Sequence, residues 1–311
     1  MQVIRDYQFL EEADRGGSAA IGNFDGVHLG HQAVIGIAAD HAARLGVPLG
    51  VLTFEPHPRE HFAPEGAPFR LMNAEAKANR LAKLGIERLY EISFTSALSA
   101  LPPPDFARDV IATGLGLAHV VVGADFRFGK DRTGTAADLA RFGAEMGFGV
   151  TEAPLVATEG LDVSSTRIRE ALTDGRPEDA AQMLGHWHRI EGEVIRGDQR
   201  GRELGYPTAN MSMDGLHLPR FGVYAVMADV LHGPHQGSYP AVASLGVRPM
   251  FGENRPNIET FLFDFQGDLY GAHLSIALRH YLRPELKFDS LEDLITQMDA
   301  DSAQARELLN A

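Results

Sequence analysis

The first half of the chain alternates short apolar runs with longer amphipathic stretches. The stretches, such as 32–45 and 73–84, carry Ala and Leu at helical spacing. Regular alternation of strands and helices predicts a parallel sheet with helices on both faces. The runs expected to form its strands are 19–22, 49–54, 88–94, 119–122 and 149–153. Because ligands bind beyond the carboxyl ends of such strands, we expect the chemistry in the loops that follow them.

The second half has a different pattern. Helical spacing over 164–184 ends at Gly185, and beyond it short alternating runs are separated by Gly, Pro, Asn and Asp. This pattern predicts an antiparallel sheet folded as a small β-barrel, followed by a helix over 290–309 with Ser290 as its N-cap. The barrel strands are expected at 190–195, 222–230, 239–245, 258–265 and 273–281. We therefore predict an α/β domain over 1–186, including a linker helix, and a β domain over 187–311.

Composition narrows the class of protein. The 311 residues are 44% hydrophobic and 23% charged, with a net charge of −14 and no Cys, which excludes disulfides, thiolate metal sites and a cysteine nucleophile. Neither half carries the basic excess of a protein that binds nucleic acid or an anionic membrane. No apolar run approaches the roughly 20 residues of a spanning helix, and the first residues are too polar for a signal peptide. We expect a cytoplasmic protein whose partners are small molecules. The sequence leaves its oligomeric state open between a monomer and a homo-oligomer.

A glycine-rich segment follows the first predicted strand and opens a helix. His28 and His31 are three residues apart, so on a helix they share one face. Two imidazoles beside the free N–H groups and the dipole of a helix N-terminus predict a phosphate site. A metal pair, or two solvated histidines, is the alternative. The residues of this segment that we expect at the site are Gly22, Asn23, Phe24, His28, Gly30 and His31.

A second segment with unusual composition opens the β domain. Thr208 and Asn210 are two residues apart, so in an extended segment they point to the same side, where a hydroxyl and an amide oxygen could share one hard cation. On spacing alone, a Gly/Pro turn with Asn in a left-handed conformation is an equally good interpretation. Repeated glycines near a strand favour a backbone that folds over phosphates. The residues concerned are Gly197, Gly201, Arg202, Gly205, Pro207, Thr208 and Asn210.

Four strings of the first half together indicate a family. The His-x-Gly-His pattern resembles the nucleotidylyltransferase superfamily, and the strings over 22–31, 53–58, 122–129 and 164–169 resemble its branch of bacterial bifunctional riboflavin kinase/FAD synthetases. The resemblance implies a Rossmann-like domain that adenylylates FMN with ATP, releasing pyrophosphate. It implies that His28 and His31, with Mg²⁺, stabilise the phosphate oxygens, and that the other strings contribute Asp125, Phe126, Arg127, Ser164, Ser165, Thr166 and Arg167 to ATP and flavin binding.

Each of these strings also has a structural interpretation. The aromatic residues of 122–129 could anchor a loop in the core rather than stack on a flat ring, and 164–169 could be an ordinary capped helix. The prolines of 53–58 stiffen a loop that presents His57, and a structural loop competes there with direct substrate contact.

The second half resembles the riboflavin kinase module of the same family. That resemblance implies that Thr208 and Asn210 bind Mg²⁺–ATP and that Glu259 is the catalytic glutamate. A 5′-hydroxyl must lose its proton as it attacks the γ-phosphorus, so one carboxylate within reach is needed as a base or orienter. The sequence departs from the family at Ser244 and Met250, where Asn and Thr are more common.

The hypothesis is therefore an enzyme with two activities. The barrel phosphorylates riboflavin to FMN and the α/β domain converts FMN to FAD, both with ATP and Mg²⁺. One alternative is an adenylyltransferase whose barrel only binds flavin, and another is an adenylyltransferase acting on nicotinamide mononucleotide or phosphopantetheine. The four histidines near turns are not spaced as zinc ligands, and we interpret them as surface or packing residues: His186, His188, His232 and His235.

Overall fold

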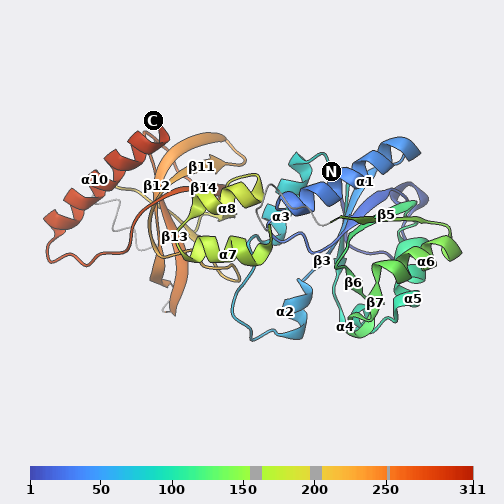
Figure 1. Cartoon of the computed structure of the whole chain (residues 1–311). Coiled ribbons are helices and arrows are strands. Elements are labelled where there is room, and N and C mark those ends of the chain that lie inside the picture. Colours follow the sequence, from blue (N-terminus) through green and yellow to red (C-terminus); the bar gives the residue numbers. More distant parts are fainter. Residues whose placement is uncertain (155–162, 197–204, 251–252, 311) are drawn as a thin grey trace. The chain divides into compact units, whose positions relative to one another are not determined.

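The computed structural model describes residues 1–154, 163–196, 205–250 and 253–310. These form two compact units, shown in Figure 1, and each is described by itself. The first unit consists of Met1–Ala67 and Lys77–Val163, and the second of Pro68–Ala76 and Ser164–Ala311. The helices after residue 163 thus group with the second unit, whereas the functional boundary expected at residue 186 stays a prediction.

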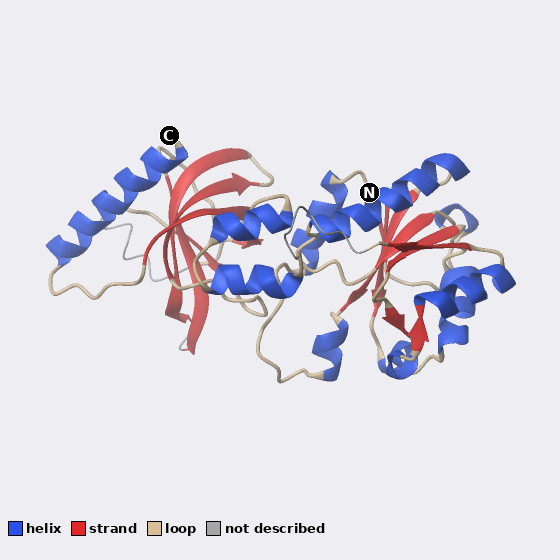
Figure 2. Cartoon of the chain, viewed as in Figure 1, coloured by secondary structure: helices blue, strands red, loops and turns tan. Residues whose placement is uncertain are grey.

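A six-stranded parallel sheet forms the centre of the first unit, as Figure 2 shows. All five predicted runs are strands, so the predicted α/β class is confirmed. The structure adds a short edge strand, β1, which the polar start of the chain did not predict. In sheet order the strands are β1 (Gln2–Ile4), β4 (Arg88–Ser93), β3 (Leu49–Glu55), β2 (Ser18–Ile21), β5 (His119–Gly123) and β8 (Gly149–Ala153).

The order of these strands fixes where a ligand can bind. After β2 the chain proceeds through β3 and β4 toward one edge of the sheet, and then returns to β5 and β8 on the other side of β2. Connections leave β2 and β5 in opposite directions, which opens a crevice beyond their carboxyl ends. The loops that follow β2 and β5 both carry predicted site residues.

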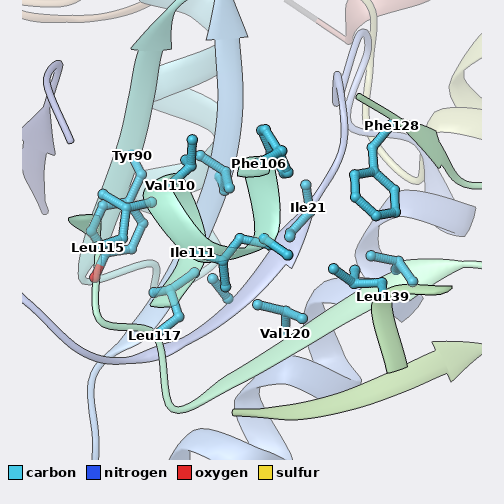
Figure 3. Packing of buried hydrophobic residues seen from close by; sticks show 14 of the residues in the cluster. Ile21, Tyr90, Phe106, Val110, Ile111, Leu115, Leu117, Val120, Phe128 and Leu139 are labelled. Atoms are coloured by element: carbon cyan, nitrogen blue, oxygen red, sulfur yellow. The ribbon is translucent and has the colours of Figure 1, made fainter. Parts of the chain in front are cut away.

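Helices and a small hairpin cover the sheet. The core packs Ile21 and Val120 of the sheet against Phe106 and Ile111 of a π-helix and Leu139 of α6, as Figure 3 shows. Burial of these large side chains supplies the main driving force for the unit. The elements between the strands are α1 (Leu29–Leu45), α2 (Pro58–Phe62), α3 (Ala74–Lys83), which begins in the segment that groups with the second unit, α4 (Ser96–Ser99), α5 (Pro103–Asp105), the π-helix η2 (Phe106–Gly114), α6 (Ala136–Met146), the 3₁₀ turns η1 (Glu12–Asp14) and η3 (Lys130–Arg132), and the hairpin β6 (Arg127–Phe128) with β7 (Gly134–Thr135).

The second unit is a nearly closed antiparallel barrel, as predicted. Its two edge strands are joined where the Ile195 N–H donates to the Asn210 carbonyl oxygen over 2.9 Å. Alternate residues, such as Val226 and Ala228, fill the interior. In sheet order the strands are β10 (Ala209–Ser212), β13 (Glu253–Leu262), β12 (Gly237–Met250), β11 (Gly222–Val230), β14 (His273–Arg283) and β9 (Arg189–Glu193).

Three helices complete the second unit: α7 (Ser165–Thr173), α8 (Pro177–Leu184) and α10 (Leu291–Leu309). Ser290 caps α10 by accepting the Asp293 N–H, as predicted. The helix packs Ala305 against Phe263 and Ala225 on the outer face of the barrel. None of the helices in the described part of the chain is long and apolar enough to span a membrane.

Candidate active sites

The loop after β2 places His28 at the N-cap of α1. The His28 Nδ1 atom accepts the backbone N–H of His31 over 3.3 Å, so the imidazole itself caps the helix. The loop that leads to it is tightly wound: Phe24 and Val27 have positive φ values of 51° and 46° and are fully buried. Backbone of this kind persists only where its surroundings hold it, which is common at ligand sites. The capped N-terminus of α1 thus stands beyond β2, where the strand order opens the crevice.

His28 and His31 lie together as predicted. Their rings stack with centroids 3.6 Å apart and planes 15° apart, and the Phe24 ring contacts His31 at 5.2 Å. Gly30 makes this stack possible, because a Cβ atom there would lie 3.1 Å from Cε1 of His28. A glycine in the His-x-Gly-His pattern therefore leaves room for the His28 ring, in addition to making the backbone flexible.

Burial keeps His31 in its neutral form. The pKa of His31 lies well below its ordinary value, first because the ring is desolvated and then because His28 and Lys77 are nearby. Its Nδ1 atom is buried and has no hydrogen-bond partner in the described structure. A neutral imidazole with an unused nitrogen can give or accept a hydrogen bond to a ligand, whereas a fixed cation can only donate.

A buried lysine lies beneath this loop, and no pattern in the sequence predicts it. The Lys77 ammonium of α3 is 2% exposed and pairs with Oε1 of Glu55 over 2.7 Å. It also donates to the Thr53 hydroxyl over 3.3 Å, and that hydroxyl donates to the Asn23 carbonyl oxygen over 3.2 Å. Thr53 belongs to the string 53–58, but it is 24 residues away from Lys77 in the chain, and only the fold brings the two together.

Aromatic rings continue from this region across the carboxyl ends of the strands. Phe62 of α2 is 69% exposed, and its ring contacts that of Phe94 at 5.8 Å. Phe94 contacts Phe54 at 5.6 Å, and the run continues through Phe106 to Phe128 in the core. These rings meet edge to face, at 76° between Phe62 and Phe94 and 73° between Phe94 and Phe54, so it is the exposed Phe62 ring that offers an apolar face to a planar ligand. Sequence patterns do not mark Phe62 and Phe94, because their contact joins the end of α2 to a loop that is far away in the chain.

The predicted residues after β5 divide into exposed and packed groups. Asp125 and Arg127 are exposed, whereas Phe126 is half-buried and stacks on Phe128 with centroids 5.6 Å apart. Phe128 belongs to the core, which agrees with the interpretation of this loop as anchored by aromatic residues. Arg127 begins β6 and is free to reach solvent or a ligand.

His57 has a structural role in the loop after β3. It is the N-cap of α2, where its Nδ1 atom accepts the Arg59 N–H over 3.1 Å. Its own N–H donates to Glu60 over 3.1 Å, which completes a capping box. Of the two interpretations of the 53–58 string, the structural loop accounts for this histidine.

The string that begins at Ser164 forms the first turn of α7. The Ser164 hydroxyl accepts the Arg167 N–H over 3.3 Å, so it is an N-cap, and Ser165 and Thr166 follow it in the helix. This helix groups with the second compact unit. The part of Ser164, Ser165, Thr166 and Arg167 in an adenylyl-transfer site therefore stays a prediction.

On the barrel, strand register aligns the residues of the second predicted site. Asn210 of β10 lies directly opposite Glu259 of β13, and Glu259 lies directly opposite Ser244 of β12. All three alternate with core residues such as Ile258, so they share the outer face of the barrel. The register thus aligns an amide, a carboxylate and a hydroxyl in one row. The hydroxyl belongs to Ser244, one of the two positions at which the sequence differs from the family that it resembles. The side chain of the other, Met250, lies outside the described residues.

Thr208 and Asn210 lie together, as their spacing predicted. Nδ2 of Asn210 is 3.4 Å from the Thr208 hydroxyl, and Oδ1 of Asn210 accepts from Nδ2 of Asn257 over 3.4 Å. Asn257 is 2% exposed, and its Oδ1 has no partner in the described structure. Asn257 could not be predicted as a site residue, because nothing in the strand pattern distinguishes an asparagine two positions before Glu259.

This donor set fits a magnesium ion. If both amides are turned over, Asn210 donates to Asn257 Oδ1, so the pair keeps its mutual hydrogen bond. The Asn210 oxygen then replaces Nδ2, which donates to the Thr208 carbonyl oxygen over 3.3 Å, and faces both that carbonyl and the Thr208 hydroxyl, an arrangement that a shared cation stabilises. The result is two neutral oxygen donors with a carboxylate in the adjacent strand position, and Mg²⁺ prefers oxygen ligands of this kind. Of the preceding predicted residues, Gly205 and Pro207 lead into β10, whereas Gly197, Gly201 and Arg202 lie outside the described residues.

The C-terminal helix borders the outer face near this row. The Tyr206 ring contacts Phe261 at 4.9 Å, and its hydroxyl donates to Asp299 of α10. Desolvation, followed by the Asp299 carboxylate, raises the pKa of Tyr206 to about 12. Tyr206 therefore stays neutral and acts as a hydrogen-bonding link between the segment before Thr208 and α10.

Comparison with protein families matches both halves of the chain. Residues 10–167 match the family model described as FAD synthetase, and residues 184–309 match the one described as riboflavin kinase. Two curated proteins, both named bifunctional riboflavin kinase/FMN adenylyltransferase, are similar over almost the whole length. The protein from Pseudomonas fluorescens is 42% identical, with 99% of this chain and 98% of its own covered, and the protein from Escherichia coli K12 is 38% identical, with 99% and 97% covered.

A solved structure shares the fold. A crystal structure described as that of a macrolide-efflux protein from Streptococcus pneumoniae matches with a TM-score of 0.82 and 31% identity, covering 98% of each chain. Both compact units therefore have counterparts in a single known structure.

Proposed function

The chain belongs to the family of bifunctional riboflavin kinase/FMN adenylyltransferases, and from that premise we propose how its residues divide two reactions between the two units. The protein phosphorylates riboflavin to FMN and adenylylates FMN to FAD. The observation that carries the division is that His28 and His31 lie in one compact unit, whereas Thr208, Asn210 and Glu259 lie in the other. We assign FAD formation to the parallel sheet and FMN formation to the barrel.

FAD formation is a transfer of an adenylyl group from ATP. A phosphate oxygen of FMN attacks the α-phosphorus, the bond to the bridging oxygen breaks, and pyrophosphate leaves with that electron pair. The attacking phosphate is already ionised near neutral pH, so the site needs to position the reactants and stabilise charge rather than remove a proton. His28, neutral His31 and the N-terminus of α1 offer hydrogen-bond donors to the crowded phosphate oxygens. Asp125, Phe126 and Arg127 border the same crevice, and Arg127 is suited to a phosphate.

The aromatic row is suited to the flavin. An isoalloxazine ring is flat and apolar on its faces, and Phe62 is the exposed end of the row. Stacking there would hold the flavin beyond the carboxyl ends of β3 and β4, with its phosphate directed to the β2 loop. This arrangement favours a flavin over the smaller nicotinamide or phosphopantetheine acceptors.

FMN formation requires removal of a proton. The 5′-hydroxyl of riboflavin attacks the γ-phosphorus of ATP, ADP leaves, and the hydroxyl proton is accepted by Glu259. Thr208 and Asn210 would hold the magnesium ion, which would neutralise phosphate charge when bound. The adjacent positions of Asn210 and Glu259 in the ladder support this arrangement, because they would set the base next to the bound nucleotide.

The experiment supplies the purified chain with riboflavin, ATP and Mg²⁺ and separates the flavins by chromatography. FMN and then FAD should appear, and both should require Mg²⁺. If neither forms, the proposal fails. With riboflavin and ATP but no supplied FMN, release of ADP distinguishes a kinase from a barrel that only binds flavin, which would release none. Because a chain without cysteine suits a reducing compartment, we place both reactions in the cytoplasm.

A further inference from the structure

A buried cation, the ammonium of Lys77, lies under the loop of the first site and contacts Glu55 and Thr53. Lys77 is 2% exposed, which is rare for lysine unless it is paired. Its partner Glu55 is 18% exposed, at the end of β3. Replacing a buried ion pair with apolar residues is often neutral or stabilising, so fold stability alone does not explain this pair.

The contacts of Lys77 lead directly to the site loop. Its ammonium donates to the Thr53 hydroxyl, and that hydroxyl donates to the Asn23 carbonyl oxygen. Asn23 stands between Gly22 and the buried Phe24, in the part of the loop with positive φ. Lys77 and Glu55 therefore hold the hydroxyl that fixes one peptide group of this loop.

Lys77 also places a positive charge next to His31. The titratable and charged groups near His31 are His28 at the start of the same helix, Lys77 from α3, and Glu55 from β3, which is paired with Lys77. Asp25 is the other buried charged residue of the loop, and it has an interaction partner of its own. Lys77 and His28 both disfavour a proton on His31, and a cation in this position also favours a polyanion above the loop.

We propose that Lys77 is a positioning residue for FAD formation: through Thr53 it fixes the peptide of Asn23, and its ammonium places a buried positive charge beside His31, beneath the phosphates. The ligand it serves is a nucleoside triphosphate, whose phosphates meet the loop and the N-terminus of α1. This inference rests on the proposed assignment of FAD formation to the first unit.

The test compares Lys77→Met with Lys83→Met, a matched control on an exposed position of the same helix. FAD formation from supplied FMN and ATP should fall at least about tenfold in Lys77→Met, because small misplacements of a reactive group are costly. Riboflavin phosphorylation by the barrel should not change. In an NMR titration of the histidine rings, His31 should titrate at higher pH in Lys77→Met than in the wild type. Lys83→Met should match the wild type in every measurement.

A second variant keeps the inference testable if Lys77→Met does not fold. Thr53→Val retains the shape of the side chain and removes the hydroxyl, so FAD formation should fall while His31 titrates as in the wild type. Wild-type rates in Lys77→Met or Thr53→Val, or an unchanged His31 titration in Lys77→Met, would overturn the inference. Failure of the wild-type chain to make FAD from FMN would instead overturn the proposed function itself.

Discussion

The imidazole rings of His28 and His31 stack 3.6 Å apart, and Gly30 lies against the edge of the His28 ring. The N-cap hydrogen bond to the His31 N–H fixes the His28 ring, which is 8% exposed, against the half-buried ring of His31. The stack is thus a rigid pair of hydrogen-bonding groups at the N-terminus of a helix, in the crevice where the sheet changes direction.

Removal of the His28 ring should separate the two reactions. In His28→Ala, FAD formation should fall about a hundredfold or more, because loss of one donor to a charged transition state has effects of that size. Riboflavin should still be phosphorylated, so FMN should accumulate, and chromatography of the flavins measures both.

A second stacked pair on the same helix provides the control for His28→Ala. His41 stacks on His119 at 3.5 Å, at the other end of α1, and His41→Ala should leave FAD formation intact. Loss of both reactions in folded His28→Ala would contradict the two-site assignment.

Gly30→Ala tests the geometry of the stack. The added methyl group would lie 3.1 Å from His28 Cε1, so the rings must shift, and we expect FAD formation to fall about tenfold. Gly36→Ala on the same helix is the control, because its Cβ would meet nothing within 4 Å. That substitution should raise the unfolding free energy by about 0.5–1 kcal/mol and leave activity unchanged. Equal activities in the two variants would show that the stack does not depend on Gly30.

The sequence predicted the strands and the loops after them well, since these depend on local patterns. Apolar runs and glycines that are close in the chain identified β2, the start of α1, and the extended segment at Asn210. Contacts between distant segments were not predictable in this way. In the sequence, Lys77 is an ordinary lysine of an amphipathic helix, and only the fold places it under β3. Phe62 and Phe94 come into contact although they follow different strands, β3 and β4. Asn257 is significant only through strand register, which a single sequence does not specify.

Glu259→Gln should stop the kinase reaction. The amide keeps the shape of the carboxylate but cannot accept the proton of the riboflavin hydroxyl, so FMN formation should fall about a hundredfold or more. FAD should still form from supplied FMN. Glu307→Gln, at an exposed position of α10, is the matched control and should behave as the wild type. A kinase rate in Glu259→Gln equal to that of the control would remove Glu259 from the mechanism.

Asn257→Leu should weaken the response of the kinase to magnesium. Asn257 hydrogen-bonds to the Asn210 amide, so its loss leaves a predicted ligand without orientation. We expect the Mg²⁺ concentration for half-maximal FMN formation to rise about tenfold, by analogy with other residues that orient metal ligands. Ser212→Ala is the control, because Ser212 lies opposite Asn257 but its hydroxyl accepts from Asp214. An unchanged magnesium response in Asn257→Leu would mean that Asn210 is held in another way.

The first unit should lose stability in weak acid because of His119. Desolvation, followed by the charges of His41 and Arg44, lowers the pKa of His119 to about 4 in the folded protein. The unfolded chain, with an ordinary histidine pKa of about 6.5, binds more protons between these values, so stability rises with pH in this window and is lost as the pH falls from about 6.5 to about 4. The Thr151 hydroxyl lies 2.9 Å from Nε2 of His119 and 3.1 Å from Nε2 of His41, which ties both neutral rings together.

Substitution of His119 isolates this effect. Between pH 7 and pH 5 the wild-type unfolding free energy should fall by up to about 2 kcal/mol on account of this one group. His119→Gln should therefore show a smaller difference between the two pH values, even if it is less stable at both. Denaturant unfolding followed at each pH measures it, with His232→Gln as a control at an exposed histidine. The same pH dependence in His119→Gln as in the control would show that His119 is not protonated on unfolding, and the neutral stacked pair would then need another explanation.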